Sequence, residues 1–176
     1  MTDKYELKQI SRNSIPAALE KAERYRIIND PSSAESICLD VLQVDPRNQE
    51  AVVTLLLAIT DQLAERPAEG ARRAQELLPR LDDEYKRTYY AGIISERGAK
   101  AHLRRGTMGS GELAYHWFRE AMEWYEKAEA RRPAGTDEPI LRWNTCARIL
   151  ARDEHIRPRV EEIGRASCRE RVFITV

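Results

Sequence analysis

Apolar residues recur every three or four positions along most of the 176-residue chain, and prolines or glycines interrupt this pattern at intervals. Such spacing keeps side chains on one face of an α-helix, whereas proline and glycine mark helix ends. The pattern predicts an all-α fold of about seven helices, with almost no strand signal before residue 170. The expected helices span residues 14–28, 31–44, 48–64, 67–78, 82–105, 112–132 and 138–153.

Local signals fix several of these boundaries. Ser14, Asp30 and one of Asp82 and Asp83 are candidate N-caps, because their side-chain oxygens can accept hydrogen bonds from a first helical turn. The stretch 106–111 (GTMGSG) predicts a flexible loop. Residues 51–59 are apolar nearly all round, so their helix is expected to be the most buried.

Two stretches share one spacing: a small residue, then steps of four, three and five that end in a proline. They are Ala34, Cys38, Val41 and Pro46, and much later Ala121, Tyr125, Ala128 and Pro133. The first two steps keep one helix face in contact with a neighbour, and the proline stops the helix. A recurring helix-stop-helix unit predicts stacked helices.

With Ala22 and Tyr25 before the first stretch and Trp143 after the second, the pattern resembles the tetratricopeptide repeat family. The unit of that family is a pair of antiparallel helices of 34 residues. The resemblance implies antiparallel helix pairs stacked as a short right-handed solenoid, with Trp143 beginning the first helix of a further pair. An ordinary antiparallel bundle is the alternative.

The match is uneven. Pro46 and Pro133 lie 87 positions apart, whereas two units of 34 residues would span 68, so 19 residues are additional. They are expected in longer helices at 82–105 and 112–132 and in the loop between them. The pair at 48–78 is degenerate, because no proline follows Leu78 at the expected distance.

The resemblance implies a non-catalytic scaffold that binds a protein or peptide on a concave surface formed by the first helix of each pair. Arg26, Tyr89 and Arg142 are the candidate binding residues, as polar or aromatic residues at expected non-core positions. Self-assembly is an alternative, since helix 138–153 would expose an apolar face that could pair with a second copy. An RNA-binding helical repeat is a third hypothesis.

The charge balance and the candidate site residues help to distinguish these three functional hypotheses. Lys and Arg number 29, as do Asp and Glu, and this balance argues against a dedicated nucleic-acid binder. The arginine pairs at 72–73, 104–105 and 131–132 could contact phosphates or acidic peptides, although such pairs are more often solvated helix ends. The three histidines lack metal-ligand spacing, so no catalytic residue, metal or cofactor is expected.

The ends of the chain are expected to lie outside the folded part. Residues 1–13 are predicted to be a flexible N-terminus, 14–156 the helical domain and 157–176 a disordered tail. Residues 162–172 (EIGRASCRERV) resemble a translated sequencing adapter, so 162–176 are expected to be artefactual and the native sequence beyond Glu161 stays open.

The chain shows neither the apolar core of a secretion signal nor an apolar run of membrane-spanning length. Its three cysteines do not form a disulfide framework. These features predict a bacterial, cytoplasmic protein that does not bind membranes.

Overall fold

The computed structural model describes residues 5–158, and these contain seven α-helices, two short 3₁₀ turns and no strand. The prediction of an all-α fold is therefore confirmed. The helices are α1 (Ile15–Ile27), α2 (Pro31–Val44), α3 (Gln49–Asp61), α4 (Pro67–Gln75), α5 (Glu84–Arg105), α6 (Ser110–Glu129) and α7 (Glu138–Arg152). The 3₁₀ turns are Arg12–Ser14 and Leu78–Arg80. The expected adapter-derived segment at 162–176 lies outside the described residues.

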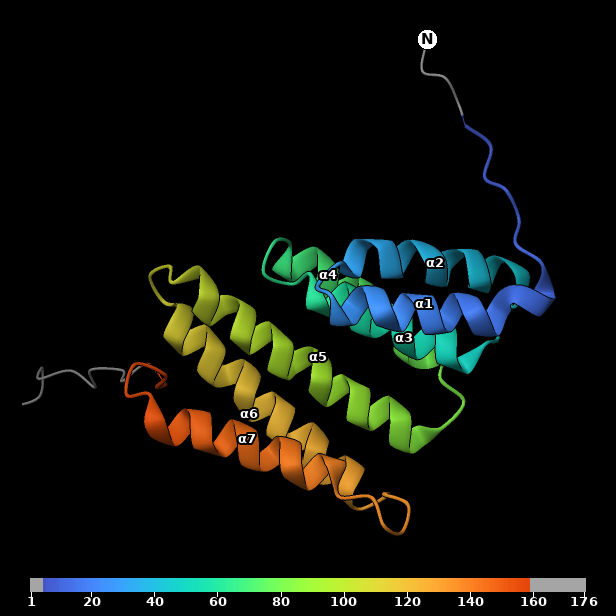
Figure 1. The fold of residues 1–176 in the computed structure, drawn as a ribbon. Coiled ribbons are helices and arrows are strands. Elements are labelled where there is room, and N and C mark those ends of the chain that lie inside the picture. Colours follow the sequence, from blue (N-terminus) through green and yellow to red (C-terminus); the bar gives the residue numbers. More distant parts are fainter. Residues whose placement is uncertain (1–4, 159–176) are drawn as a thin grey trace, which may run out of the picture.

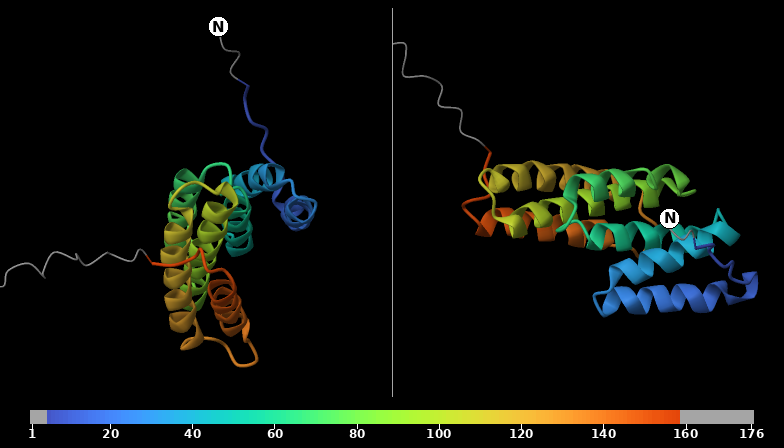
Figure 2. Two further views of the ribbon diagram at one scale, coloured as in Figure 1. Left: turned by 90° about the vertical axis from the view of Figure 1, so that its left-hand side faces the viewer. Right: turned by 90° about the horizontal axis from the view of Figure 1, so that it is seen from above.

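The helices follow one another through the molecule in chain order. Each packs against the helix next to it in the sequence, and α1 also contacts α3, as α3 contacts α5. Figure 1 shows α1–α4 as one group and α5–α7 as another, with α5 facing the first group. In both views of Figure 2, α1 and α6 lie on opposite sides of the molecule.

Most predicted helix ends agree with the structure. Asp30 and Asp83 cap α2 and α5, where their carboxylates accept hydrogen bonds from the backbone N–H groups of Ser33 (3.2 Å) and Tyr85 (2.8 Å). Ser14 precedes α1 without capping it, because its hydroxyl donates instead to the Ser11 carbonyl at 2.8 Å.

Three helices end earlier than expected, and a proline follows each of them. Helix α3 stops at Asp61 instead of 64, ahead of Pro67. Helix α4 stops at Gln75 instead of 78, and a 3₁₀ turn that contains Pro79 follows. Helix α6 stops at Glu129 instead of 132, ahead of Pro133. A proline disfavours helical geometry in the residue before it, so the chain leaves the helix before it reaches the ring.

Two apolar clusters form the core, and α5 contributes to both of them. The first cluster joins α1–α4 and includes Ile94 and Ala101 of α5. The second joins α5–α7 and includes Tyr89 and Ile93 of α5. Helix α5 therefore connects the two halves of the molecule through buried side chains on both sides.

Most residues of the repeated spacing are buried at helix contacts. Those with no exposed surface are Ala22, Ala34, Cys38, Val41, Ala121, Tyr125 and Ala128. Tyr25 and Trp143 are partly buried against the two clusters, while Pro46 and Pro133 lie exposed after their helices. Small side chains at these contacts allow the helix axes to approach closely.

Aromatic side chains of α6 pack directly against two glycines of α5. A Cβ atom on Gly92 would lie 2.5 Å from the ring of Tyr125, and one on Gly98 would lie 2.6 Å from the ring of Trp117. Both distances are shorter than atoms tolerate, so two aromatic rings of α6 occupy space that only glycine leaves free.

We expect Gly92→Ala to destabilise the protein by about 1–3 kcal/mol, because the added methyl group would overpack the Tyr125 ring. Alanine is otherwise the better helix former by about 1 kcal/mol. In a Tyr125→Ala background the same change should therefore stabilise the protein. Urea unfolding of the four proteins in this cycle measures both effects, and an equal cost in both backgrounds would refute the proposed contact.

Candidate functional site

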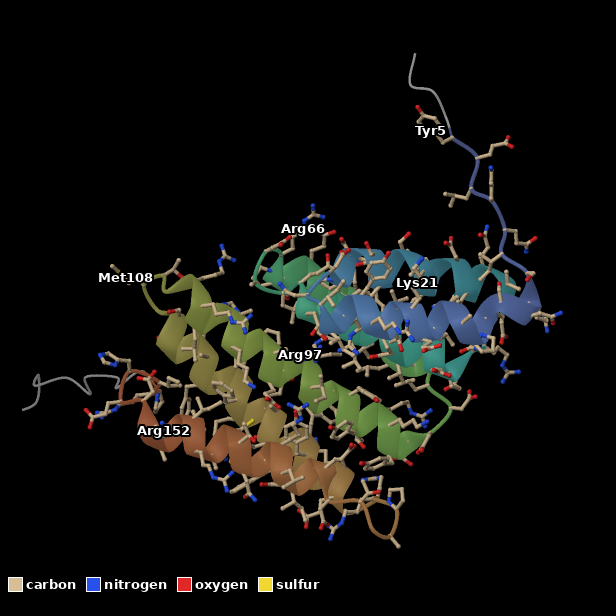
Figure 3. All side chains as sticks on the ribbon, in the orientation of Figure 1. Tyr5, Lys21, Arg66, Arg97, Met108 and Arg152 are labelled. Carbon is tan, nitrogen blue, oxygen red and sulfur yellow. The ribbon has the colours of Figure 1, made fainter. Side chains whose placement is uncertain are left out.

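An open hollow of about 430 Å³ lies between the two halves of the molecule, and we call it the inner hollow. Side chains from α1, α3, α5 and α7 line it, together with Pro31 at the start of α2 and residues of the turns that follow α1 and α3. Figure 3 shows Arg97 in this space, between α1 and α5. The eight charged side chains of the lining are Glu23, Arg26, Asp61, Glu96, Arg97, Lys100, Arg104 and Arg142.

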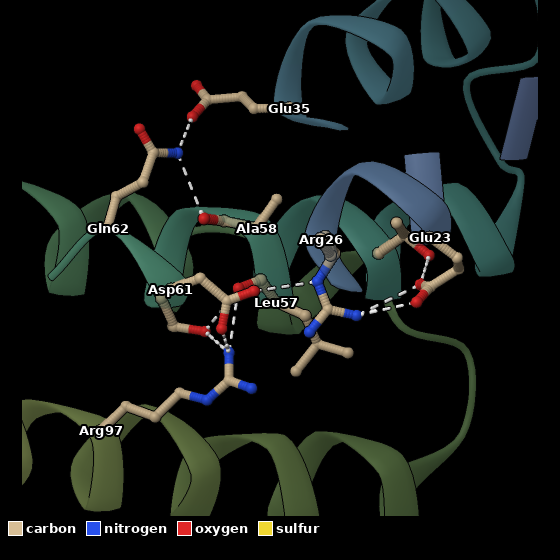
Figure 4. Close-up of polar contacts among 10 residues, drawn as sticks. Glu23, Arg26, Glu35, Leu57, Ala58, Asp61, Gln62 and Arg97 are labelled. Atoms are coloured by element: carbon tan, nitrogen blue, oxygen red, sulfur yellow. Dashed lines mark hydrogen bonds and ion pairs between the residues drawn. The ribbon is translucent and has the colours of Figure 1, made fainter. Parts of the chain in front are cut away.

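Asp61 joins three helices on one side of the hollow. Its carboxylate accepts from Arg26 Nε of α1 at 3.0 Å and pairs with Arg97 Nη1 of α5 at 2.8 Å (Figure 4). Arg26 also pairs with Glu23 at 3.0 Å, and Arg97 donates to the Leu57 carbonyl at 2.9 Å. One carboxylate of α3 therefore holds an arginine of α1 and an arginine of α5.

Glu96 has the corresponding position on the other side of the hollow. Its side chain is only 1% exposed, and its carboxylate pairs with Lys100 and with Arg142 of α7 at 3.4 Å. The hydroxyl of Tyr125 in α6 donates to its Oε2 at 2.7 Å. A buried carboxylate needs such partners, since an uncompensated charge in the interior is costly.

Burial and these contacts shift several pKa values. Burial raises the pKa of Tyr125 above its ordinary value, and the Glu96 charge adds to this effect, so the hydroxyl stays protonated and can donate. Burial lowers the pKa of Arg97, while Asp61 opposes the shift. Burial also acts to lower the pKa of Arg142, but Glu96 and Tyr89 outweigh it and the pKa is raised. Both guanidinium groups carry charge near neutral pH.

The structure brings together two of the three sequence-predicted binding residues, since Arg26 and Arg142 line the same hollow from α1 and α7. Arg26 is largely occupied by its two carboxylate partners, with 14% of its side chain exposed. Arg142 is more accessible, with 40% of its side chain exposed.

Tyr89 does not have the non-core position expected from the sequence. It is 8% exposed and belongs to the second core cluster, where its ring lies 6.0 Å from that of Tyr125. Helix α5 packs on two sides, so a position that would face solvent on an ordinary amphipathic helix is covered here. Burial raises the pKa of Tyr89, and its neighbour Arg142 acts against this rise.

Sequence reasoning missed the polar stripe of α5 that forms one wall of the hollow. Glu96, Arg97, Lys100 and Arg104 follow one another at steps of one, three and four, which places them on one face of the helix. Gly92 lies four residues before Glu96 and borders this face next to Tyr125, whereas Gly98 lies on another face of the helix. The spacing of these four charged residues along one face of a predicted helix was the available signal.

Other kinds of site have little support in residues 5–158. No cluster of three or more His, Cys, Asp and Glu side chains that could hold a metal ion occurs in this range. No helix within it has both the length and the apolar character needed to cross a bilayer. Cys38 and Cys146 are buried, and burial raises the pKa of each thiol to about 12, which disfavours the reactive thiolate.

Comparison with models of known protein families, with curated proteins and with solved structures gave no match. The resemblance to tetratricopeptide repeats therefore depends on the spacing of residues within this chain. Functional conclusions depend on the geometry and charge of the inner hollow.

We expect Asp61→Asn to destabilise the protein by about 1–3 kcal/mol, because it leaves Arg26 and Arg97 close together without a shared anion. Asp40→Asn on α2 is the matched control, since Asp40 forms no ion pair with a described residue, and it should change stability by less than about 0.5 kcal/mol. Urea unfolding checks both variants. Equal stability of the two would show that the Asp61 contacts do not hold the helices together.

Proposed function

We propose that this protein is a non-catalytic helical-repeat scaffold that binds a peptide or protein segment in the inner hollow. The observation that carries the proposal is that alternate helices supply most of the lining of one hollow: α1, α3, α5 and α7 contribute side chains, α2 contributes only its first residue, Pro31, and α4 and α6 contribute none. In this proposal the helices form antiparallel pairs of a short right-handed solenoid, and the first helix of each pair faces the ligand.

The packing of the chain supports this arrangement. Helices contact their neighbours in sequence, and α1 also contacts α3 as α3 contacts α5, as expected when units are added one after another. The buried alanines Ala34 of α2 and Ala121 of α6 lie at the same distance before the prolines that follow these helices, Pro46 and Pro133. The degenerate middle pair corresponds to α3 and the short α4, and the 19 additional residues correspond to the long α5 and α6.

The chemistry of the hollow favours recognition over catalysis. Its carboxylates Glu23, Asp61 and Glu96 are each held in an ion pair with an arginine or a lysine. Groups fixed in this way present charge in a defined geometry, and they provide electrostatic complementarity to a partner. In this proposal Arg142 contacts the ligand. Arg26 is instead held by its carboxylate partners and helps to form the wall of the hollow.

Self-assembly through α7 has less support. Leu141 is 63% exposed, but Arg148 and Arg152 are also exposed on this helix, and Ile149 and Leu150 pack partly against the second core cluster. A single exposed leucine among arginines is a small apolar surface for a stable dimer.

The scaffold proposal is tested by locating where selected peptides bind. A random peptide library is panned against the protein, and a benzoylphenylalanine photo-crosslinker is placed either at Ile27, which is 81% exposed at the hollow, or at Leu113, which is 47% exposed on α6. We expect the enriched peptides to crosslink from position 27 and not from position 113, as read by mass spectrometry. No enrichment over a scrambled library, or equal crosslinking from both positions, would refute the function.

A further inference from the structure

The inner hollow carries more positive than negative charge, although the whole chain has formal net charge +0. Five of its charged side chains are arginine or lysine and three are carboxylates. Resting on the scaffold function proposed above, we infer that the hollow binds an acidic segment of a partner protein. Its carboxylates would lie on Arg104, Lys100 and Arg142, and an adjacent apolar side chain would lie on Ile27.

The cations differ in how far they are already neutralised. Arg26 and Arg97 share Asp61, and Arg26 has Glu23 as well. Lys100 and Arg142 share the single carboxylate of Glu96. Arg104 is exposed and forms no ion pair with a described residue. The excess positive charge therefore lies along α5 and α7. An incoming carboxylate could accept hydrogen bonds there from N–H groups that the carboxylates of the hollow do not occupy.

An apolar contact lies next to these cations. Ile27 at the end of α1 is 81% exposed and lines the hollow, and Ala64 and Ala101 are among its other apolar lining residues. An exposed isoleucine such as Ile27 at the edge of a hollow favours contact with an apolar group of a partner. Acidic residues with an adjacent leucine or a residue of similar size would complement both features.

The lining favours an acidic peptide over RNA. A nucleic-acid backbone carries a charge at every nucleotide, so its binding surfaces present continuous positive charge. Here Glu23, Asp61 and Glu96 alternate with the cations and would repel successive phosphates. The aromatic residues that stack on bases in single-strand binders are not among the residues that line this hollow.

The inference is tested with a fluorescein-labelled peptide of alternating glutamate and leucine and with its counterpart in which every glutamate is glutamine. Fluorescence anisotropy should show that the glutamate peptide binds at least about tenfold more tightly, which corresponds to about 1.4 kcal/mol. Its affinity should also fall as NaCl rises from about 50 to about 200 mM, because exposed charges are screened.

Arg104→Glu should lower the affinity for the glutamate peptide by about tenfold or more. Arg104→Gln should lower it by less, because only charge reversal adds repulsion to the lost contact. Arg105→Glu is the matched control: both arginines are exposed in the last turn of α5, but Arg105 does not line the hollow. The affinity of Arg105→Glu for the glutamate peptide should stay within about twofold of that of the unchanged protein. Circular dichroism and urea unfolding verify that all three variants are folded.

Three results would overturn the inference: no binding of the glutamate peptide, equal binding of both peptides, or an equal loss in Arg104→Glu and Arg105→Glu. Tighter binding of an oligo-uridine than of the glutamate peptide, with loss in Arg104→Glu, would assign the hollow to RNA instead. If selected neutral peptides still crosslink from position 27, the scaffold function stands and only the acidic partner is rejected.

Discussion

The fold depends on helix α5, which must pack against neighbours on opposite sides at once. Ile94 and Ala101 join the core of α1–α4, while Tyr89 and Ile93 join that of α6 and α7. Glycine makes this arrangement compatible with large rings on α6, because Gly92 leaves the space that the Tyr125 ring fills. The close approach then brings the Tyr125 hydroxyl within hydrogen-bond distance of Glu96, one turn along the same helix.

This contact links the packing of the core to the electrostatics of the hollow. Glu96 is buried beneath the surface, held by Tyr125 from below, and it fixes Lys100 and Arg142 above it. Asp61 does the same for the arginines of α1 and α5. Each carboxylate therefore connects helices that are distant in sequence, and together they keep the cations of the hollow in place.

The sequence was sufficient for the elements and much of the core. Prolines, N-caps and helical spacing predicted seven helices, and the buried positions Ala34, Val41 and Ala121 followed from the repeated pattern. Those signals are local, because a cap or a stop acts within one turn of the helix. They also placed Arg26 on α1 and Arg142 on α7, and both of these helices line the hollow.

The remaining part of the site depends on contacts between distant residues, which local patterns do not specify. Tyr89 was expected to be accessible, but the second packing surface of α5 covers it. Glu96 and Arg97 are adjacent in sequence, yet one pairs with α7 and the other with α3. Which partner a charged side chain takes is decided by the orientation of α5 between its neighbours.

That orientation also determines what the hollow offers to a ligand. Because Glu96 already restricts Lys100 and Arg142, these long side chains have less conformational entropy to lose when a partner binds. The single carboxylate of Glu96 cannot neutralise both Lys100 and Arg142. The two cations are therefore held in place and still attract a further anion. For the function proposed above, a buried anion below two partly exposed cations would be a physical basis for selective binding of an acidic partner by a chain without formal net charge.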